Sequence, residues 1–231
     1  FALLWKSVIG NKPLVRLIAC FSITNFMSGM SQGVSLLYLT NYLLLSSSVN
    51  VVFALVIPIS MLGIPFWGWW MTKYSRQRVW AVSLVLGGMF YASMGLLQPN
   101  PSIALLATLF GSMAFCILST VVAVPVIMGD IIDYGREKFG VERAGLYMSL
   151  QGQVVKGMAA ISAGAGLILL GWVGFDATKS GEALTPQAVS ALKWVVAWFP
   201  ALGLTVTGAL LWLFPISGSW KKSSAPSSAE A

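Results

Sequence analysis

Leu17 to Thr72 reads LIACFSITNFMSGMSQGVSLLYLTNYLLLSSSVNVVFALVIPISMLGIPFWGWWMT and contains no Asp, Glu, Lys or Arg. A helix needs about 20 predominantly apolar residues to cross the hydrocarbon core of a bilayer, so this stretch is long enough for two crossings. In the whole 231-residue chain, 57% of the residues are hydrophobic and 9% are charged, whereas soluble domains carry roughly a quarter charged residues. We therefore expect a membrane protein with several spans.

The apolar runs are continuous rather than alternating, which predicts helices and not a closed barrel. The expected fold class is all-α, with a cytoplasmic segment at residues 1–13, a six-helix bundle at 14–215 and a disordered Ser/Ala/Pro-rich tail at 216–231. Because the chain opens on Phe1 instead of Met, we expect it to begin partway through a longer polypeptide. The six expected spans are Leu14–Leu45, Val51–Met71, Val79–Leu97, Ser102–Met128, Ala144–Val173 and Val189–Phe214.

The basic residues gather on one side of these spans, which favours the cytoplasmic side of a cell (inner) membrane and places both termini there. This distribution explains the formal charge of +7 without a nucleic-acid partner. The other side holds Lys179 and Lys193. The cytoplasmic side holds Lys6, Lys12, Arg16, Lys73, Arg76, Arg78, Arg136, Lys138, Arg143, Lys221 and Lys222.

The composition argues against an enzyme and against a cofactor. The chain contains no His, which excludes His-dependent catalytic triads and His-ligated metals. Its two cysteines, Cys20 and Cys116, lie inside apolar runs, where a free thiol behaves as a small hydrophobe. No disulfide and no metal site are therefore expected.

Lys156 is the one charged residue that falls deep inside an expected span. A lysine at that depth costs at least a few kcal/mol and needs a carboxylate or a wet cavity. At 100° per residue, Ser149 and Gln153 share its stripe on the helix, and we expect this stripe to face the bundle interior and line a cavity. The alternative is a purely structural pair between Lys156 and a buried acid elsewhere.

The first span carries a looser stripe of uncharged hydrogen-bonding residues, Ser22, Asn25, Ser28 and Gln32, spaced three or four residues apart. Such groups suit a polyhydroxy ligand in a cavity. Hydrogen bonds between helices are an equally good interpretation.

Three indoles, Trp67, Trp69 and Trp70, close the second span. Tryptophan is enriched where a membrane helix meets the headgroups. We expect these side chains in the interfacial belt rather than in a ligand site.

Two motifs indicate a family. Residues 129–135 read GDIIDYG, followed by Lys138, Gly140 and Gly145, and residues 11–14 read NKPL. Together with Lys156, these motifs resemble the C-terminal half of the glycoside-pentoside-hexuronide:cation symporters, the melibiose permease family of the major facilitator superfamily. The loop at residues 68–78, GWWMTKYSRQR, is similar to the loop between the second and third helices of each superfamily half, although Thr72 and Ser75 replace its usual Asp and Gly.

The resemblance implies six helices arranged as two inverted three-helix repeats, which pair with an N-terminal six-helix half of the same transporter within membrane lipid. It implies sodium- or proton-coupled symport of a sugar or glycoside by alternating access, with the cation bound mainly by the missing half. A lysophospholipid symporter of the same fold and a non-transporting membrane scaffold are the alternatives. The residues expected at a cytoplasmic gate are Asp130, Asp133, Tyr134, Arg143, Lys73 and Arg76.

Overall fold

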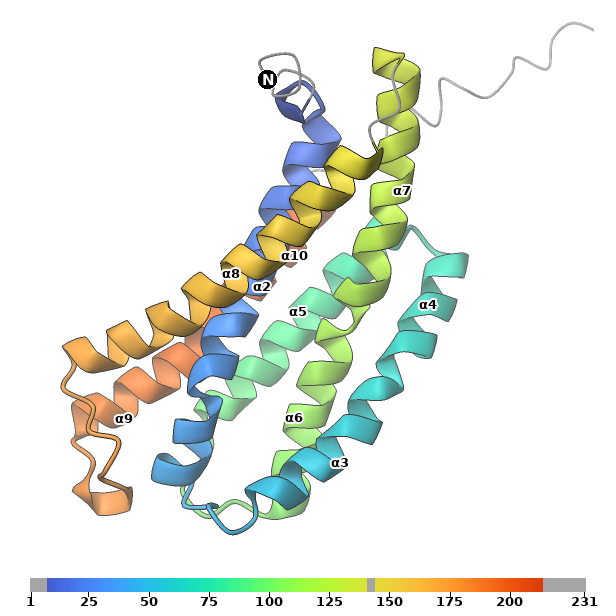
Figure 1. The fold of residues 1–231 in the computed structure, drawn as a ribbon. Helices are drawn as coiled ribbons and strands as arrows, with labels where there is room; N and C mark the ends of the chain where they lie inside the picture. The colour runs from blue at the N-terminus through green and yellow to red at the C-terminus, as the bar shows by residue number, and fades with distance from the viewer. Residues whose placement is uncertain (1–7, 141–143, 214–231) are drawn as a thin grey trace, which may run out of the picture.

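A computed structural model describes residues 8–140 and 144–213, and most of them are helical (Figure 1). The all-α fold class is therefore confirmed for the described residues. The elements are α2 (Lys12–Leu37) with its π-helical extension η1 (Tyr38–Tyr42), α3 (Val49–Met61), α4 (Gly63–Lys73), α5 (Arg76–Gly95), α6 (Ile103–Ile117), α7 (Ser119–Phe139), α8 (Ala144–Trp172), the 3₁₀ turn η2 (Gly181–Ala183), α9 (Pro186–Lys193), the π-helical η3 (Trp194–Trp198) and α10 (Phe199–Leu213).

Among the described residues, five continuous helical stretches are long and apolar enough to cross a membrane. The one expected span that is not among these five, Val79–Leu97, coincides with α5. The 20 residues of α5 extend about 30 Å, the thickness of the hydrocarbon core. Arg76 and Arg78 at its start lower its hydropathy, and so do its glycines and serines. The five stretches are Lys12–Tyr42, Val49–Lys73, Ile103–Lys138, Ala144–Trp172 and Pro186–Leu213.

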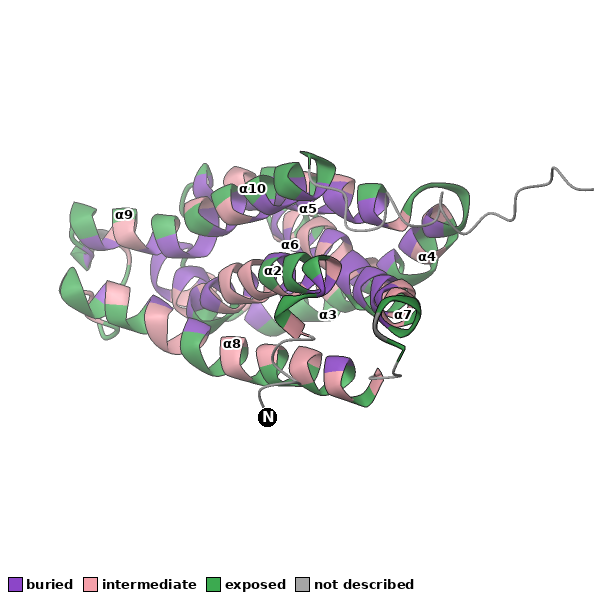
Figure 2. Ribbon diagram, turned by 90° about the horizontal axis from the view of Figure 1, so that it is seen from above, coloured by how far each residue is buried: buried purple, intermediate pink, exposed green. Residues whose placement is uncertain are grey.

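The helices run alongside one another, and α8 and α10 lie on opposite sides of α2 (Figure 2). The most extensive pairings are α2 with α8, α5 with α10, and α3 with α6. Small residues allow these close approaches, because a Cβ added to Gly88 would lie 2.9 Å from the Ala201 carbonyl oxygen, and one added to Gly208 would lie 2.8 Å from that of Ala81. Close packing of this kind holds helices together where lipid supplies no hydrophobic drive.

The ends of the bundle differ in charge. The start of α2 and the end of α7 lie together at one end (Figure 1), which we name the basic end. The loop between α8 and α9 lies at the opposite end, with Lys179 and Lys193. Seven described basic residues belong to helix termini at the basic end, namely Lys12, Arg16, Lys73, Arg76, Arg78, Arg136 and Lys138.

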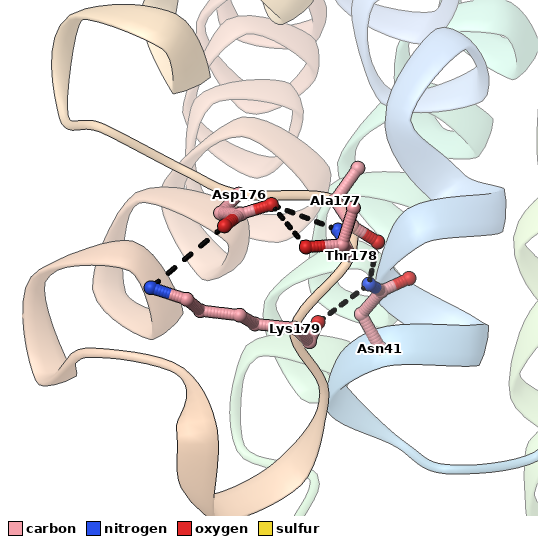
Figure 3. Close-up of polar contacts among 5 residues, drawn as sticks. All are labelled: Asn41, Asp176, Ala177, Thr178 and Lys179. Carbon is pink, nitrogen blue, oxygen red and sulfur yellow. Dashed lines mark hydrogen bonds and ion pairs between the residues drawn. The ribbon is translucent and has the colours of Figure 1, made fainter.

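The loop after α8 is fastened to η1 at the opposite end (Figure 3). The Asn41 side-chain amide donates to the carbonyl oxygens of Ala177, at 2.8 Å, and Lys179, at 2.7 Å. Within the loop, Asp176 accepts hydrogen bonds from the Thr178 hydroxyl and backbone amide, and the hydroxyl bond is the main cause that lowers the pKa of Asp176. These contacts hold the end of α2 beside the end of α8.

The span that contains Pro125 is interrupted at Leu118, between α6 and α7, while α7 continues through the proline. The interruption lies against α4, where the Trp67 indole N–H donates to the Phe115 carbonyl oxygen at 2.8 Å. That carbonyl belongs to the last turn of α6, next to the interruption. Trp67 is 1% exposed, so its expected interfacial position is wrong, whereas the 54% exposure of Trp69 suits an interface.

Replacing Trp67 with Phe keeps an aromatic ring but removes the only donor of the indole. We expect a loss of about 1–2 kcal/mol in unfolding free energy, because the Phe115 carbonyl loses a buried partner. The midpoint of thermal unfolding in detergent measures the effect. Trp172→Phe is the control, because Trp172 is 81% exposed; equal shifts for the two variants would contradict the role given to the Trp67 hydrogen bond.

Candidate functional site

A hollow with several polar residues in its wall lies between α2, α7 and α8 and has a volume of about 410 Å³. Three of the four residues in the polar stripe expected on the first span, Asn25, Ser28 and Gln32, line it, and Ser22 does not. Its wall is therefore mixed, with amide and hydroxyl groups set among apolar side chains. The remaining lining residues are Phe21, Thr24, Gly29, Ile117, Thr120, Val121, Val124, Pro125, Gln151, Val155 and Ala159.

Two of the predicted polar groups on α2 are hydrogen bonded within their own helix. The Asn25 amide donates to the Phe21 carbonyl oxygen at 2.8 Å, and the Ser28 hydroxyl donates to that of Thr24 at 2.8 Å. These bonds satisfy both donors in an apolar environment. The Ser28 side chain also hydrogen bonds with the Tyr91 side chain of α5, so it lines the hollow while tied to a neighbouring helix.

Gln151 on α8 is a site residue that the sequence analysis did not identify. Its amide oxygen is buried and has no hydrogen-bond partner among the described residues. A buried acceptor without a partner costs about 1–3 kcal/mol. Gln151 lies one helical turn after the buried Tyr147, and this spacing identifies its face once the burial of Tyr147 is known.

The polar stripe of α8 lies elsewhere. Ser149, Gln153 and Lys156 are all exposed, and none of them lines the hollow. Helical spacing places them on the side of α8 that faces away from α2, because Ser162 and Gly166 occupy the α2 side. The expectation that this stripe faces the interior of the six-helix bundle is therefore wrong, and its functional role stays a prediction.

The face of α8 that carries Lys156 combines glycines and polar residues with exposed apolar ones such as Leu167. A Cβ added to Gly145, Gly152 or Gly164 would meet no atom within 4 Å. Only 17% of the residues in the apolar 18-residue segment of α8 are buried, compared with 50% in the corresponding segment of the stretch that contains α9 and α10. Apolar side chains are exposed on both helices, with Met148, Ile161 and Ile168 on α8 and Leu202, Val206 and Leu210 on α10. The surface of α8 is thus open and carries both polar and apolar residues.

An ion pair joins α5 to α7 at the basic end. One guanidinium nitrogen of Arg76, Nη1, lies 3.0 Å from Asp130 Oδ1 and 2.9 Å from Asp130 Oδ2. The Asp130 side chain is 14% exposed and that of Arg76 is 41% exposed. Partial burial strengthens such a pair relative to one in water. The structure therefore brings two of the six predicted gate residues into contact.

The other predicted gate residues in the described part of the chain, Asp133, Tyr134 and Lys73, also lie at this end. Asp133 is exposed on α7. Lys138 Nζ lies 5.4 Å from the centre of the Tyr134 ring, and Lys73 Nζ lies 4.0 Å from the centre of the Trp69 ring. Arg143 falls outside the described residues, so its part in a gate stays a prediction.

The three helices around the hollow are tied together at the basic end. Asn11 is fully buried; its side-chain oxygen accepts from the Leu14 amide at 3.2 Å, and its amide donates to the Tyr147 hydroxyl at 3.3 Å. This pair rests on Gly135 of α7, where an added Cβ would lie 3.0 Å from the Tyr147 hydroxyl oxygen. One small cluster therefore sets the spacing of α2, α7 and α8.

Two glycines of α7 provide a matched test of this cluster. Gly135→Ala should lower the unfolding free energy by about 1 kcal/mol, because the Tyr147 hydroxyl must move to admit the methyl group. Gly129→Ala should be neutral or stabilise by up to about 1 kcal/mol, since nothing lies within 4 Å of its added Cβ and Ala favours helix. Thermal unfolding midpoints compare them, and two equal effects would contradict close packing at Gly135.

Comparison with known proteins gives two findings. Residues 2–218 match the family described as MFS/sugar transport protein. The sodium-dependent lysophosphatidylcholine symporter 1 of Xenopus tropicalis is 23% identical over 223 residues, which are 94% of this chain and 41% of that relative. The chain thus spans about two fifths of the length of the relative that it matches.

Proposed function

The chain belongs to the MFS/sugar transport protein family, and from this membership we propose that it forms one six-helix half of a cation-coupled symporter. The family consists of transporters rather than enzymes, and the chain is a multi-pass membrane protein. The observation that carries the proposal is the hollow between α2, α7 and α8, into which uncharged polar groups project from within membrane spans. Polar groups are costly inside a membrane, and these ones are placed where a substrate in the hollow would meet them.

An inverted-repeat arrangement accounts for the packing of the helices. Let the first repeat be α2, α3 with α4, and α5, and let the second be α6 with α7, α8, and α9 to α10. A two-fold axis that exchanges the two repeats maps the α2–α8 pairing onto the α6–α3 pairing. It maps the α5–α10 pairing onto itself. All three pairings are extensive. Such repeats are common among transporters, and α5 is then the sixth span.

A second six-helix half would cover the least buried spans. Within Val49–Lys73, only 22% of the residues in the apolar 18-residue segment are buried, and the value for α8 is 17%. In the other three membrane-spanning stretches, 44–50% of the corresponding residues are buried. The glycines beside Lys156 on α8 allow another helix to approach closely. We propose that this half closes the hollow and supplies the carboxylates that bind sodium or a proton.

The first candidate substrate is a sugar or glycoside. Asn25, Ser28 and Gln32 offer neutral hydrogen-bonding groups, and the unpartnered oxygen of Gln151 can accept a bond from a ligand hydroxyl. A hydroxyl bound there would remove the cost of leaving that oxygen unsatisfied. Lys156 would act from the neighbouring face, either on the sugar or as a counter-charge for the cation site.

The second candidate is a lysophospholipid, which the name of the Xenopus tropicalis relative suggests. The hollow also has an apolar wall that includes Ile117, Val121 and Val124, and an acyl chain could lie against it. Lys156 would then attract the phosphate. This candidate is distinguished from the first by the substrate that is taken up and not by the fold.

The proposed cycle alternates access between the two ends of the bundle. Positive residues gather at the basic end, so we propose that this end is cytoplasmic in a cell membrane. The Arg76–Asp130 pair would belong to a latch there, with Asp133 and Arg143 as further members. Closure of this latch would favour the outward-facing state.

Uptake into liposomes by the full-length protein tests both candidates. Labelled glycoside and labelled lysophosphatidylcholine should be compared under an inward sodium gradient, a proton gradient and no gradient. Lys156→Ala should reduce gradient-driven uptake about tenfold or more, because a buried bond to a charged group is lost. Lys156→Arg should restore only part of it, since Arg differs in shape and donor geometry.

Lys193→Ala is the control, because Lys193 lies at the opposite end, where its ammonium stacks on Tyr42. A sugar contact at Lys156 predicts weaker substrate binding at every cation concentration, whereas a counter-charge predicts an altered cation dependence. Uptake of lysophosphatidylcholine alone would replace the first candidate with the second. Parent-like transport by Lys156→Ala would contradict both roles of Lys156, and uptake of neither substrate would leave the scaffold alternative.

A further inference from the structure

An apolar groove lies between α5 and α10. Both helices are on the side of the bundle opposite α8 (Figure 2). The groove has a volume of about 420 Å³, and its walls include Val82, Val85 and Leu86 of α5 and Ala209 of α10. All its lining residues are apolar. The close contact of Gly208 with the Ala81 backbone forms its floor. Inside a bilayer, such a groove is filled by hydrocarbon and not by water.

The groove continues toward the basic end into a second hollow of about 230 Å³, which shares Val82 and Trp212 with it. This hollow is lined by Arg78 and the aromatic residues Trp70 and Tyr74. The Arg78 guanidinium carbon lies 5.5 Å from the centre of the Trp212 ring. Arg78 is exposed, and no described acidic side chain forms a salt bridge with it.

These two hollows match the two parts of a phospholipid. The apolar groove has room for an acyl chain along α5 and α10, while Arg78, which pairs with no described carboxylate, stands where the headgroup would lie. Tryptophan and tyrosine at the junction are the side chains that favour the headgroup level. Arginine also binds phosphate oxygens in a bidentate manner. Charge complementarity therefore favours an anionic lipid over a zwitterionic one.

We propose that this groove binds one anionic phospholipid of the leaflet at the basic end, with its phosphate on Arg78 and an acyl chain against Val82, Val85 and Ala209. The site is separate from the hollow between α2, α7 and α8, and the proposal does not depend on the transported substrate. It makes α5 and α10 a lipid-selective face of the protein.

Quenching of Trp212 fluorescence by brominated lipid tests the proposal in the full-length protein in vesicles. The Trp212 signal is the difference between parent and Trp212→Phe, measured with brominated phosphatidylglycerol and with brominated phosphatidylcholine. The parent should prefer phosphatidylglycerol, and Arg78→Gln should reduce that preference about fivefold, the effect of one basic residue near a membrane surface. Arg78→Lys should retain most of it.

Lys73→Gln is the matched control, because Lys73 also stacks on an indole, at 4.0 Å, but does not line the groove. It should leave the preference unchanged. Ala209→Phe fills the groove while Arg78 remains, and it should reduce quenching by both lipids. The proposal is overturned by equal quenching by the two lipids in the parent, by an unchanged preference in Arg78→Gln, or by an equal loss in Lys73→Gln.

Discussion

Hydrocarbon cannot hydrogen bond, so every polar group inside the spans must find its partner in the protein. Asn25 and Ser28 meet this requirement by bonding to their own helix. The carbonyl of Phe115, at the end of α6, meets it through the indole of Trp67. The helix interruption at Leu118 can therefore exist at membrane depth without leaving that carbonyl unpaired.

Two groups on α8 depart from this pattern. The Gln151 oxygen is buried without a described partner, and Lys156 stands exposed near the middle of a span. Each costs free energy in the described bundle. A ligand in the hollow and the proposed second half against α8 would remove both costs, and α8 would then link substrate binding to assembly of the proposed transporter.

Composition and charge spacing were sufficient to predict the all-α fold of the described residues and their five long apolar stretches, although the fourth expected span continues past Met128 to Lys138. Asn25, Ser28 and Gln32 line one wall of a hollow, because spacing on a single helix depends only on its period, and their role in binding a ligand stays a prediction. The direction of the Lys156 stripe was not predicted correctly, since it depends on which side of α8 packs against α2. Gln151 was missed for the same reason. The burial of Trp67 was missed because the carbonyl group that its indole contacts lies far away in the sequence.

The proposed role of Lys156 in transport requires that this side chain faces a water-filled cavity and not lipid. The direct measurement is the reaction rate of Lys156→Cys with a charged, water-soluble thiol reagent in the full-length protein, after the buried Cys20 and Cys116 are replaced by Ala. Val206→Cys serves as the lipid-facing reference, since Val206 is 53% exposed within α10. We predict that Cys at 156 reacts and is protected by substrate, while Cys at 206 does not react. A Cys at 156 as unreactive as that at 206 would contradict the account.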